Sequence, residues 1–98
     1  MDVEFADKSL ALIETDEAAK TGLPVSVITS FRDKFVLVRA AADERVFRNW
    51  KSLHYEKLEG YKDNRRSIRL NKQWRVVFTI NTGCSPNKIK VLAVEDYH

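Results

Sequence analysis

The spacing of the apolar residues changes near the middle of this chain, and that change limits the folds it can adopt. In the first half, one stripe recurs at intervals of three and four residues, as on the buried face of a helix: Ile28, Phe31, Phe35 and Val38. From residue 65 onward, apolar and polar residues alternate, as in a strand with one buried face. Helices followed by hairpin-connected strands predict an α+β fold, with N-terminal helices packed on one face of a small antiparallel β-sheet. The opposite face, which carries Arg69 and Arg75, is then available for function.

Capping residues set the expected bounds of the helices. Asp7 or Ser9 suits the cap of a first helix that continues to Gly22, a residue that commonly stops helices. Pro24 suits the first position of a second helix that reaches about residue 42. Asp43 suits the cap of a short third helix that ends near residue 50.

The second half of the chain is expected to form strands joined by turns. Residues 71–73 are a plausible hairpin turn between the first two of these strands. Residues 88–97 predict a third strand that alternates strictly, with Ile89, Val91 and Ala93 on one face and Leu92 and Val94 on the other. Residues 3–5 are expected to pair as a further short strand.

Length and composition predict one small intracellular domain. Ninety-eight residues, 44% of them hydrophobic, suffice for one modest core, so a single domain over residues 1–98 is expected. The single Cys84 excludes an internal disulfide. The sequence has no cluster of Cys and His residues that would predict a zinc site, so neither a metal nor a cofactor is expected. There is no secretion signal and no apolar run of membrane-spanning length. We therefore expect a cytoplasmic protein without membrane contact.

The net charge of +3 conceals a regional imbalance. Residues 1–30 carry six acidic and two basic residues, a net charge of −4, whereas residues 31–76 carry thirteen basic and six acidic residues, a net charge of +7. Tyr55 and Tyr61 interrupt a run of cations in the basic region: Lys57, Lys62, Arg65, Arg66 and Arg69. Interleaved cations and aromatics are typical of surfaces that bind RNA. A charged sheet edge that deters aggregation would give the same pattern.

The chain also carries the groups that a metal-independent ribonuclease needs. Such an enzyme uses the 2′-hydroxyl of the RNA as nucleophile and supplies a base, an acid and cations for the phosphate. Arg75 interrupts an apolar strand and can hold a phosphate with two hydrogen bonds, although a salt bridge on the sheet face is an equally good explanation. His98 suits proton transfer near neutrality, with Asp96 and Tyr97 beside it to orient the imidazole or stack on a base. His54 is a second candidate base, for which an ordinary surface loop is the alternative.

Three segments of the sequence resemble one family. They are Leu58-Glu59-Gly60, the strand pair SIRLNKQWRVVF over residues 67–78, and the closing VEDYH over residues 94–98. Together they resemble the HigB family of the RelE/ParE toxin superfamily. The resemblance implies a RelE-like fold and a toxin that enters the ribosomal A site, contacts 16S rRNA and cuts translated mRNA to leave a cyclic phosphate and a 5′-hydroxyl. It also implies a HigA-type antitoxin that contains a helix-turn-helix. The toxin is then expected to contact operator DNA only through this antitoxin.

The resemblance also assigns roles to residues. Arg75 would stabilise the charge on the phosphorane, His98 would transfer a proton, and Tyr97 would stack on or orient the substrate base beside Asp96. The family pattern breaks between residues 54 and 59, where Glu56 stands at the position of a histidine and Glu59 at that of a lysine.

Substitutes for both missing side chains lie two residues away along the same segment. His54 can replace the histidine and Lys57 the lysine, because two positions along an extended segment face the same way. Equally, Glu56 can be the general base if burial raises its pKa. The general base is therefore open among Glu56, His54 and His98.

Three other functions fit the same sequence. A non-enzymatic ParE-like toxin would poison DNA gyrase by binding, an RNA-binding module would use the basic region without chemistry, and a degenerate toxin would bind its antitoxin but not cut. The closing Asp-Tyr-His favours the ribonuclease.

Overall fold

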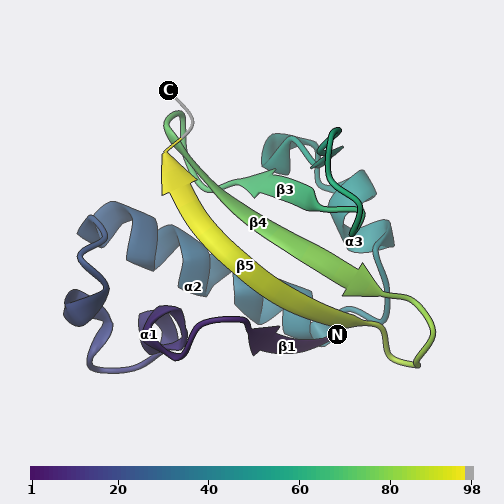
Figure 1. Ribbon diagram of the computed structural model, residues 1–98. Helices are drawn as coiled ribbons and strands as arrows, with labels where there is room; N and C mark the ends of the chain where they lie inside the picture. The colour runs from purple at the N-terminus through teal and green to yellow at the C-terminus, as the bar shows by residue number, and fades with distance from the viewer. Residues whose placement is uncertain (97–98) are drawn as a thin grey trace.

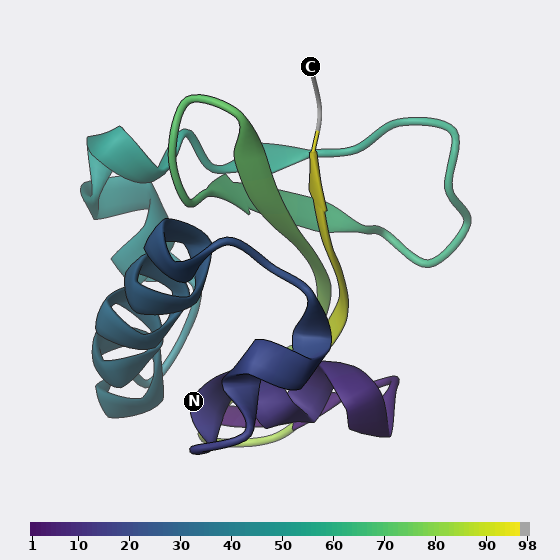
Figure 2. The same cartoon turned by 90° about the vertical axis from the view of Figure 1, so that its left-hand side faces the viewer.

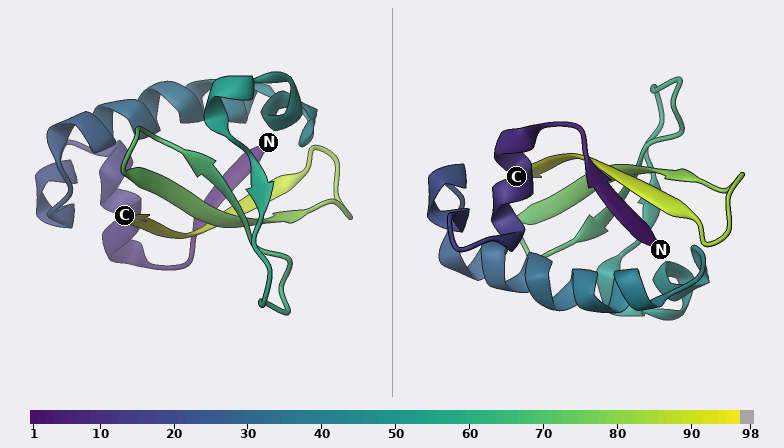
Figure 3. Two further views of the ribbon diagram at one scale, coloured as in Figure 1. Left: turned by 90° about the horizontal axis from the view of Figure 1, so that it is seen from above. Right: turned by 90° about the horizontal axis from the view of Figure 1, so that it is seen from below.

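A computed structural model of the chain describes residues 1–96. The elements follow in the order β1 (Asp2–Phe5), α1 (Lys8–Ala11), η1 (Leu12–Glu14), η2 (Ala18–Thr21), α2 (Val25–Ala40), α3 (Arg45–Asn49), η3 (Lys51–Leu53), β2 (Glu56–Lys57), β3 (Arg66–Arg69), β4 (Trp74–Asn81) and β5 (Lys88–Asp96). The long helix α2 runs across one face of the sheet (Figure 1), and α3 lies on the same side (Figure 3). The predicted α+β layout is confirmed.

The sheet has five strands in the order β1-β5-β4-β3-β2. The predicted hairpin of β3 and β4 is present, and β4 pairs with β5 in antiparallel fashion. The edge strand β1 was expected, but it runs parallel to β5, which makes the sheet mixed. The two-residue β2 was not predicted as a strand.

The core lies between α2 and the sheet face that it covers. All four residues of the predicted helical stripe are buried, together with apolar residues of three strands: Ile68, Val76, Phe78, Ile89 and Val91. Phe31 and Phe35 stack with their ring centroids 4.0 Å apart. Each fully buried side chain of this size contributes about 1.5–3 kcal/mol to stability, so this layer fixes α2 against the strands.

The first helix is shorter than predicted. Asp7 does cap it, since its Oδ1 accepts a hydrogen bond from Ser9 N at 2.8 Å, and Gly22 does end the region with a φ of 75°. Between them, however, the helix gives way to two 3₁₀ turns. Thr15 Oγ1 donates to Leu12 O at 2.8 Å and accepts from Glu17 N at 3.1 Å. Its hydroxyl thus binds backbone groups in competition with the helix, and the predicted continuous helix is wrong.

The other two helices differ from the prediction by one or two residues. Pro24 is the residue before α2 rather than its first member, and α2 ends at Ala40. The amino group of Met1 donates to Val38 O and to Arg39 O, both at 3.0 Å, which satisfies carbonyl groups of the last turn. Asp43 does accept a hydrogen bond from Arg45 N at 3.0 Å, as a capping residue would. The Arg45 side chain also binds Asp43 and lowers the pKa of its carboxyl group.

A bulge interrupts the alternation of β5. Val77 pairs with Ala93 whereas Phe78 pairs with Val91, so Leu92 is an extra residue with no partner of its own in the register. Val94 consequently packs against the core together with Val91, and the predicted strict alternation is wrong beyond Leu92. The bulge also places Glu95 on the sheet face away from α2, because Glu95 pairs with Arg75.

Candidate active site

Three charged residues form a row across the sheet face that α2 leaves uncovered. Arg69 on β3 lies directly opposite Arg75 on β4, and Arg75 in turn lies opposite Glu95 on β5. Like charges that face each other across strands destabilise a sheet unless something compensates them. Glu95, in the same row, compensates part of this repulsion because it pairs with Arg75.

A small pocket lies beside this row. It is a hollow of about 130 Å³ lined by His54, Glu56, Ser67, Arg69 and Arg75. The pairing of Glu56 with Ser67 on the neighbouring strand brings β2 to its edge. Two guanidinium groups, an imidazole and a carboxylate thus meet in a pocket that would hold one small anionic group.

Two carboxylates contact Arg75. Its Nε and Nη2 lie 2.9 and 2.7 Å from Oε1 of Glu95, and its Nη1 lies 3.9 Å from Oε1 of Glu56. The side chain of Arg75 is only 24% exposed. Arg75 therefore forms the predicted salt bridge on the sheet face and also lines the pocket, while its role in holding a phosphate stays a prediction.

His54 reaches the pocket through a left-handed turn. It ends η3 with φ 48° and ψ 50°, and its backbone N–H donates to Lys51 O at 3.1 Å. Leu53, which precedes it, is fully buried and anchors the turn. The imidazole Nε2 lies 3.4 Å from Nη1 of Arg69. Residues with a Cβ avoid this backbone region, and such conformations cluster at functional sites.

Glu56 lines the pocket, but its side chain is 62% exposed. The burial on which that role depended is therefore not found, and the role of Glu56 as general base stays a prediction. Its position 3.9 Å from Arg75 makes it a counter-charge of the arginine.

The closing triplet is described only in part. Asp96 pairs with Trp74, which places it on the face opposite Glu95, and its Oδ2 accepts a hydrogen bond from Gln73 Nε2 at 2.6 Å. Asp96 does not line the pocket. Tyr97 and His98 lie outside the described residues, so their catalytic roles stay predictions.

The five predicted RNA-binding cations do not form one track. Only Arg69 lines the pocket, while Lys57 is exposed on the edge strand β2. Lys62 and Arg65 belong to the loop between β2 and β3, which projects from the sheet (Figure 2). In that loop, Arg65 lies 4.5 Å from the ring centroid of Tyr61 and binds Asp63 at 3.1 Å.

Arg66 faces the helix layer rather than the pocket. Its charge acts on Tyr55, whose pKa is raised to about 12 because burial disfavours the charged phenolate. The positive charge of Arg66 opposes this shift, and a hydrogen bond from the hydroxyl to Glu44 Oε2 at 3.1 Å adds to it. Arg66 and Tyr55 thus belong to the packing between α3 and the sheet.

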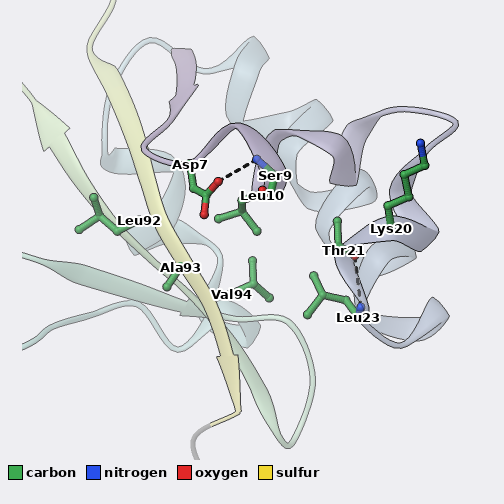
Figure 4. A pocket seen from close by; sticks show the side chains of 9 residues that line it. All are labelled: Asp7, Ser9, Leu10, Lys20, Thr21, Leu23, Leu92, Ala93 and Val94. Carbon is green, nitrogen blue, oxygen red and sulfur yellow. Dashed lines mark hydrogen bonds between the residues drawn. The ribbon is translucent and has the colours of Figure 1, made fainter.

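A larger groove lies between β5 and the N-terminal segment (Figure 4). It encloses about 320 Å³ and is lined by Asp7, Ser9, Leu10, Lys20, Thr21, Leu23, Leu92, Ala93 and Val94. Its two ionisable residues are Asp7, which caps α1, and Lys20, which pairs with Glu17. This groove lacks an acid–base set, so the small basic pocket is the better candidate for chemistry.

Sequence reasoning missed Glu95 and Ser67. Ser67 is 2% exposed and lies at the floor of the pocket, and its only signal was its place in the alternation with Ile68. Glu95 stands within the closing VEDYH segment, but strict alternation would place it on the same face as Ile89 and Val91, which are buried.

The described residues contain neither a cluster of metal ligands nor a membrane-spanning helix. Within residues 1–96, no group of three or more His, Cys, Asp or Glu side chains is arranged to hold a metal ion. No helix in the same range has the length and apolar character needed to cross a membrane.

The fold is similar to that of a RelE-like toxin. A solved structure, the YoeB/ParE toxin from Agrobacterium tumefaciens, matches over 100% of both chains with a TM-score of 0.61 and 13% identity, which shows the shared fold. Residues 3–98 match the family model described as "RelE-like toxin of type II toxin-antitoxin system HigB". Toxin HigB-1 of Vibrio cholerae serotype O1 is 32% identical over 94 residues, which span 90% of this chain and 99% of the relative.

The chain belongs to the HigB-like toxin family. It is therefore the toxin of a type II toxin-antitoxin system and has an antitoxin as its partner.

Proposed function

We propose that this toxin is a metal-independent endoribonuclease that cuts mRNA on translating ribosomes. The observation that carries the proposal is the placement of Arg69 and Arg75 opposite each other in one pocket with His54. Glu95 and Glu56 compensate part of this positive charge in the free protein. A phosphodiester bound between the two arginines would compensate it further, so the pocket suits an RNA phosphate.

The two arginines would act on the phosphate during cleavage. Attack by the 2′-hydroxyl adds charge to the phosphoryl oxygens as the P–O bond forms, and guanidinium groups already in place stabilise that charge. Arg75 would bind these oxygens through its Nη1 side, which faces the pocket. Arg69 would bind from the neighbouring strand.

Proton transfer requires a base at the 2′-hydroxyl and an acid at the leaving 5′-oxygen. The imidazole of His54 lines the pocket, with its Nε2 near Nη1 of Arg69. A phosphate that binds Arg69 would free the Nε2 of His54 from this contact, so that it could accept the 2′-hydroxyl proton. His98 is the candidate for the acid that protonates the 5′-oxygen. Tyr97 would stack on the substrate base. The products would be a 2′,3′-cyclic phosphate and a 5′-hydroxyl.

The proposed setting is the ribosomal A site in the cytoplasm. Lys57, Lys62 and Arg65 are exposed or partly exposed outside the pocket and suit contact with 16S rRNA rather than with the scissile phosphate. The antitoxin partner would be a HigA-type protein whose helix-turn-helix binds operator DNA. The toxin would act as a single domain over residues 1–98.

A reconstituted translation reaction tests this function. The purified toxin is added with and without ribosomes, and the 5′ ends of the mRNA are mapped and probed for a 5′-hydroxyl. We expect cleavage only on translating ribosomes, lost in Arg75→Ala and His54→Ala and kept in Arg45→Ala. Arg45 is a matched control, because it is an exposed arginine that pairs with Asp43 away from the pocket.

Other outcomes point to the rival functions. Intact mRNA with a supercoiling defect would indicate a gyrase-binding toxin, and retardation of naked RNA without cleavage would indicate an RNA-binding module. Intact mRNA without growth arrest would indicate a degenerate toxin. Each of these results contradicts the proposal.

A further inference from the structure

Glu95 makes two close side-chain contacts with Arg75. Both Nε and Nη2 of the arginine lie within 2.9 Å of the same oxygen, Oε1 of Glu95. The two residues face each other in the β4–β5 register, so the backbone itself holds them together. Arg75 is only 24% exposed, and charge-assisted hydrogen bonds are stronger where solvent is partly excluded. This ion pair therefore restrains the guanidinium.

The contact with Glu95 opposes the repulsion between Arg75 and Arg69. Arg69 faces Arg75 from the other neighbouring strand, so the two positive charges repel each other. Arginine also has several rotatable bonds, so a guanidinium needs contacts to keep one orientation. A carboxylate on the side away from Arg69 opposes both effects.

Glu56 contacts Arg75 more loosely than Glu95 does. It lies 3.9 Å from Nη1, and its side chain is 62% exposed, against 42% for Glu95. The looser contact is on the side that faces the pocket. A ligand phosphate can therefore take the place of Glu56 while Glu95 stays bound to the Nε side.

We propose that Glu95 is the positioning residue of Arg75: it holds the Nε edge of the guanidinium so that the Nη1 side faces the phosphate. The bulge at Leu92 makes this possible, because it turns Glu95 to the face of the sheet that carries Arg75. The proposal rests on the proposed ribonuclease function for its kinetic consequence, but the restraint itself can be measured without RNA.

The first experiment observes the arginine directly. The Nε–Hε group of Arg75 is followed by ¹⁵N NMR in the wild type, in Glu95→Gln and in Glu4→Gln. Glu4 is the control, because it is an exposed glutamate on the same sheet face that pairs with Lys88 at 3.9 Å. We expect a protected Nε–Hε signal in the wild type and in Glu4→Gln, and faster exchange with solvent in Glu95→Gln. Unchanged exchange in Glu95→Gln would overturn the proposal.

The second experiment measures cleavage in the reconstituted translation reaction. A misplaced catalytic group can cost about 100-fold in rate, so we expect kcat to fall at least about tenfold in Glu95→Gln with KM for ribosomes little changed. If Glu95 instead competed with RNA for Arg75, its removal would raise kcat/KM. A higher or unchanged rate therefore contradicts positioning.

Two further results keep the inferences separate. If Glu95→Gln does not fold, Glu95→Asp serves in its place, because it keeps the charge but withdraws the carboxylate, and the same loss of Nε–Hε protection is expected. If the wild type shows the protected signal but never cleaves RNA, the proposed function fails while the restraint stands. If the wild type cleaves RNA and Glu95→Gln cleaves equally well, only the positioning role fails.

Discussion

The left-handed backbone of His54 allows a direct test of how the pocket is built. At φ 48° and ψ 50°, a residue with a Cβ pays about 1–2 kcal/mol, whereas glycine adopts this region freely. The greater freedom of glycine in the unfolded chain offsets about 0.4–1 kcal/mol of that advantage. We therefore expect His54→Gly to be more stable than His54→Ala by about 1 kcal/mol, even though both variants lose the imidazole.

Urea unfolding, followed by tryptophan fluorescence, measures this difference. For a small protein, 1 kcal/mol shifts the midpoint by roughly 0.3–1 M urea. Val36 is the matched control, because it lies within α2 and is 68% exposed. There glycine costs about 1 kcal/mol relative to alanine, so the order of the two variants should reverse. If His54→Gly unfolds at lower urea than His54→Ala, the turn that brings the imidazole to Arg69 is not left-handed.

Three further predictions concern stability. Phe35→Ala should cost about 3–5 kcal/mol in urea unfolding, because the fully buried ring leaves a cavity beside Phe31, whereas Leu37→Ala, at a half-exposed site, should cost far less. Asn71→Ala should cost about 1–2 kcal/mol, because the Asn71 Oδ1 accepts from the backbone N–H groups of Gln73 and Trp74, both at 2.9 Å. The folded pKa of Tyr55, about 12, lies above its ordinary 10.0, so its contribution to stability is complete below pH 10 and is lost as the pH rises toward 12. Tyr55→Phe should lack this loss when unfolding is compared at neutral and alkaline pH.

The parts of the fold that the sequence predicted are those in which one face of an element is buried. The stripe on α2 and the alternation in β3 and β4 both record contact with the core, so each could be found within a few residues of sequence. The parallel pairing of β1 with β5 joins Val3 to Ile89. No local pattern encodes that pairing, because it depends on how the two ends of the chain meet.

In the candidate site, too, the sequence predicted individual residues but not how they come together. His54 and Arg75 were found because their chemistry is unusual for their surroundings in the sequence. Their meeting in one pocket depends on the left-handed turn after Leu53 and on the pairing of β2 with β3. Neither feature has a sequence signal, since the turn uses no glycine and β2 is only two residues long.

The bulge at Leu92 decides how the closing segment of the chain is used. Strict alternation would turn Glu95 toward the core and Asp96 toward the face that carries Arg75. One extra residue in β5 exchanges these positions, so Glu95 binds Arg75 and Asp96 binds Gln73 at the β3–β4 hairpin. The exchange also adds an apolar side chain to the core, because Val94 packs against it together with Val91. Packing and the candidate site thus favour the same bulge: the apolar side chain that the core needs and the carboxylate that Arg75 needs are one residue apart, and both reach their places only when Leu92 is left unpaired.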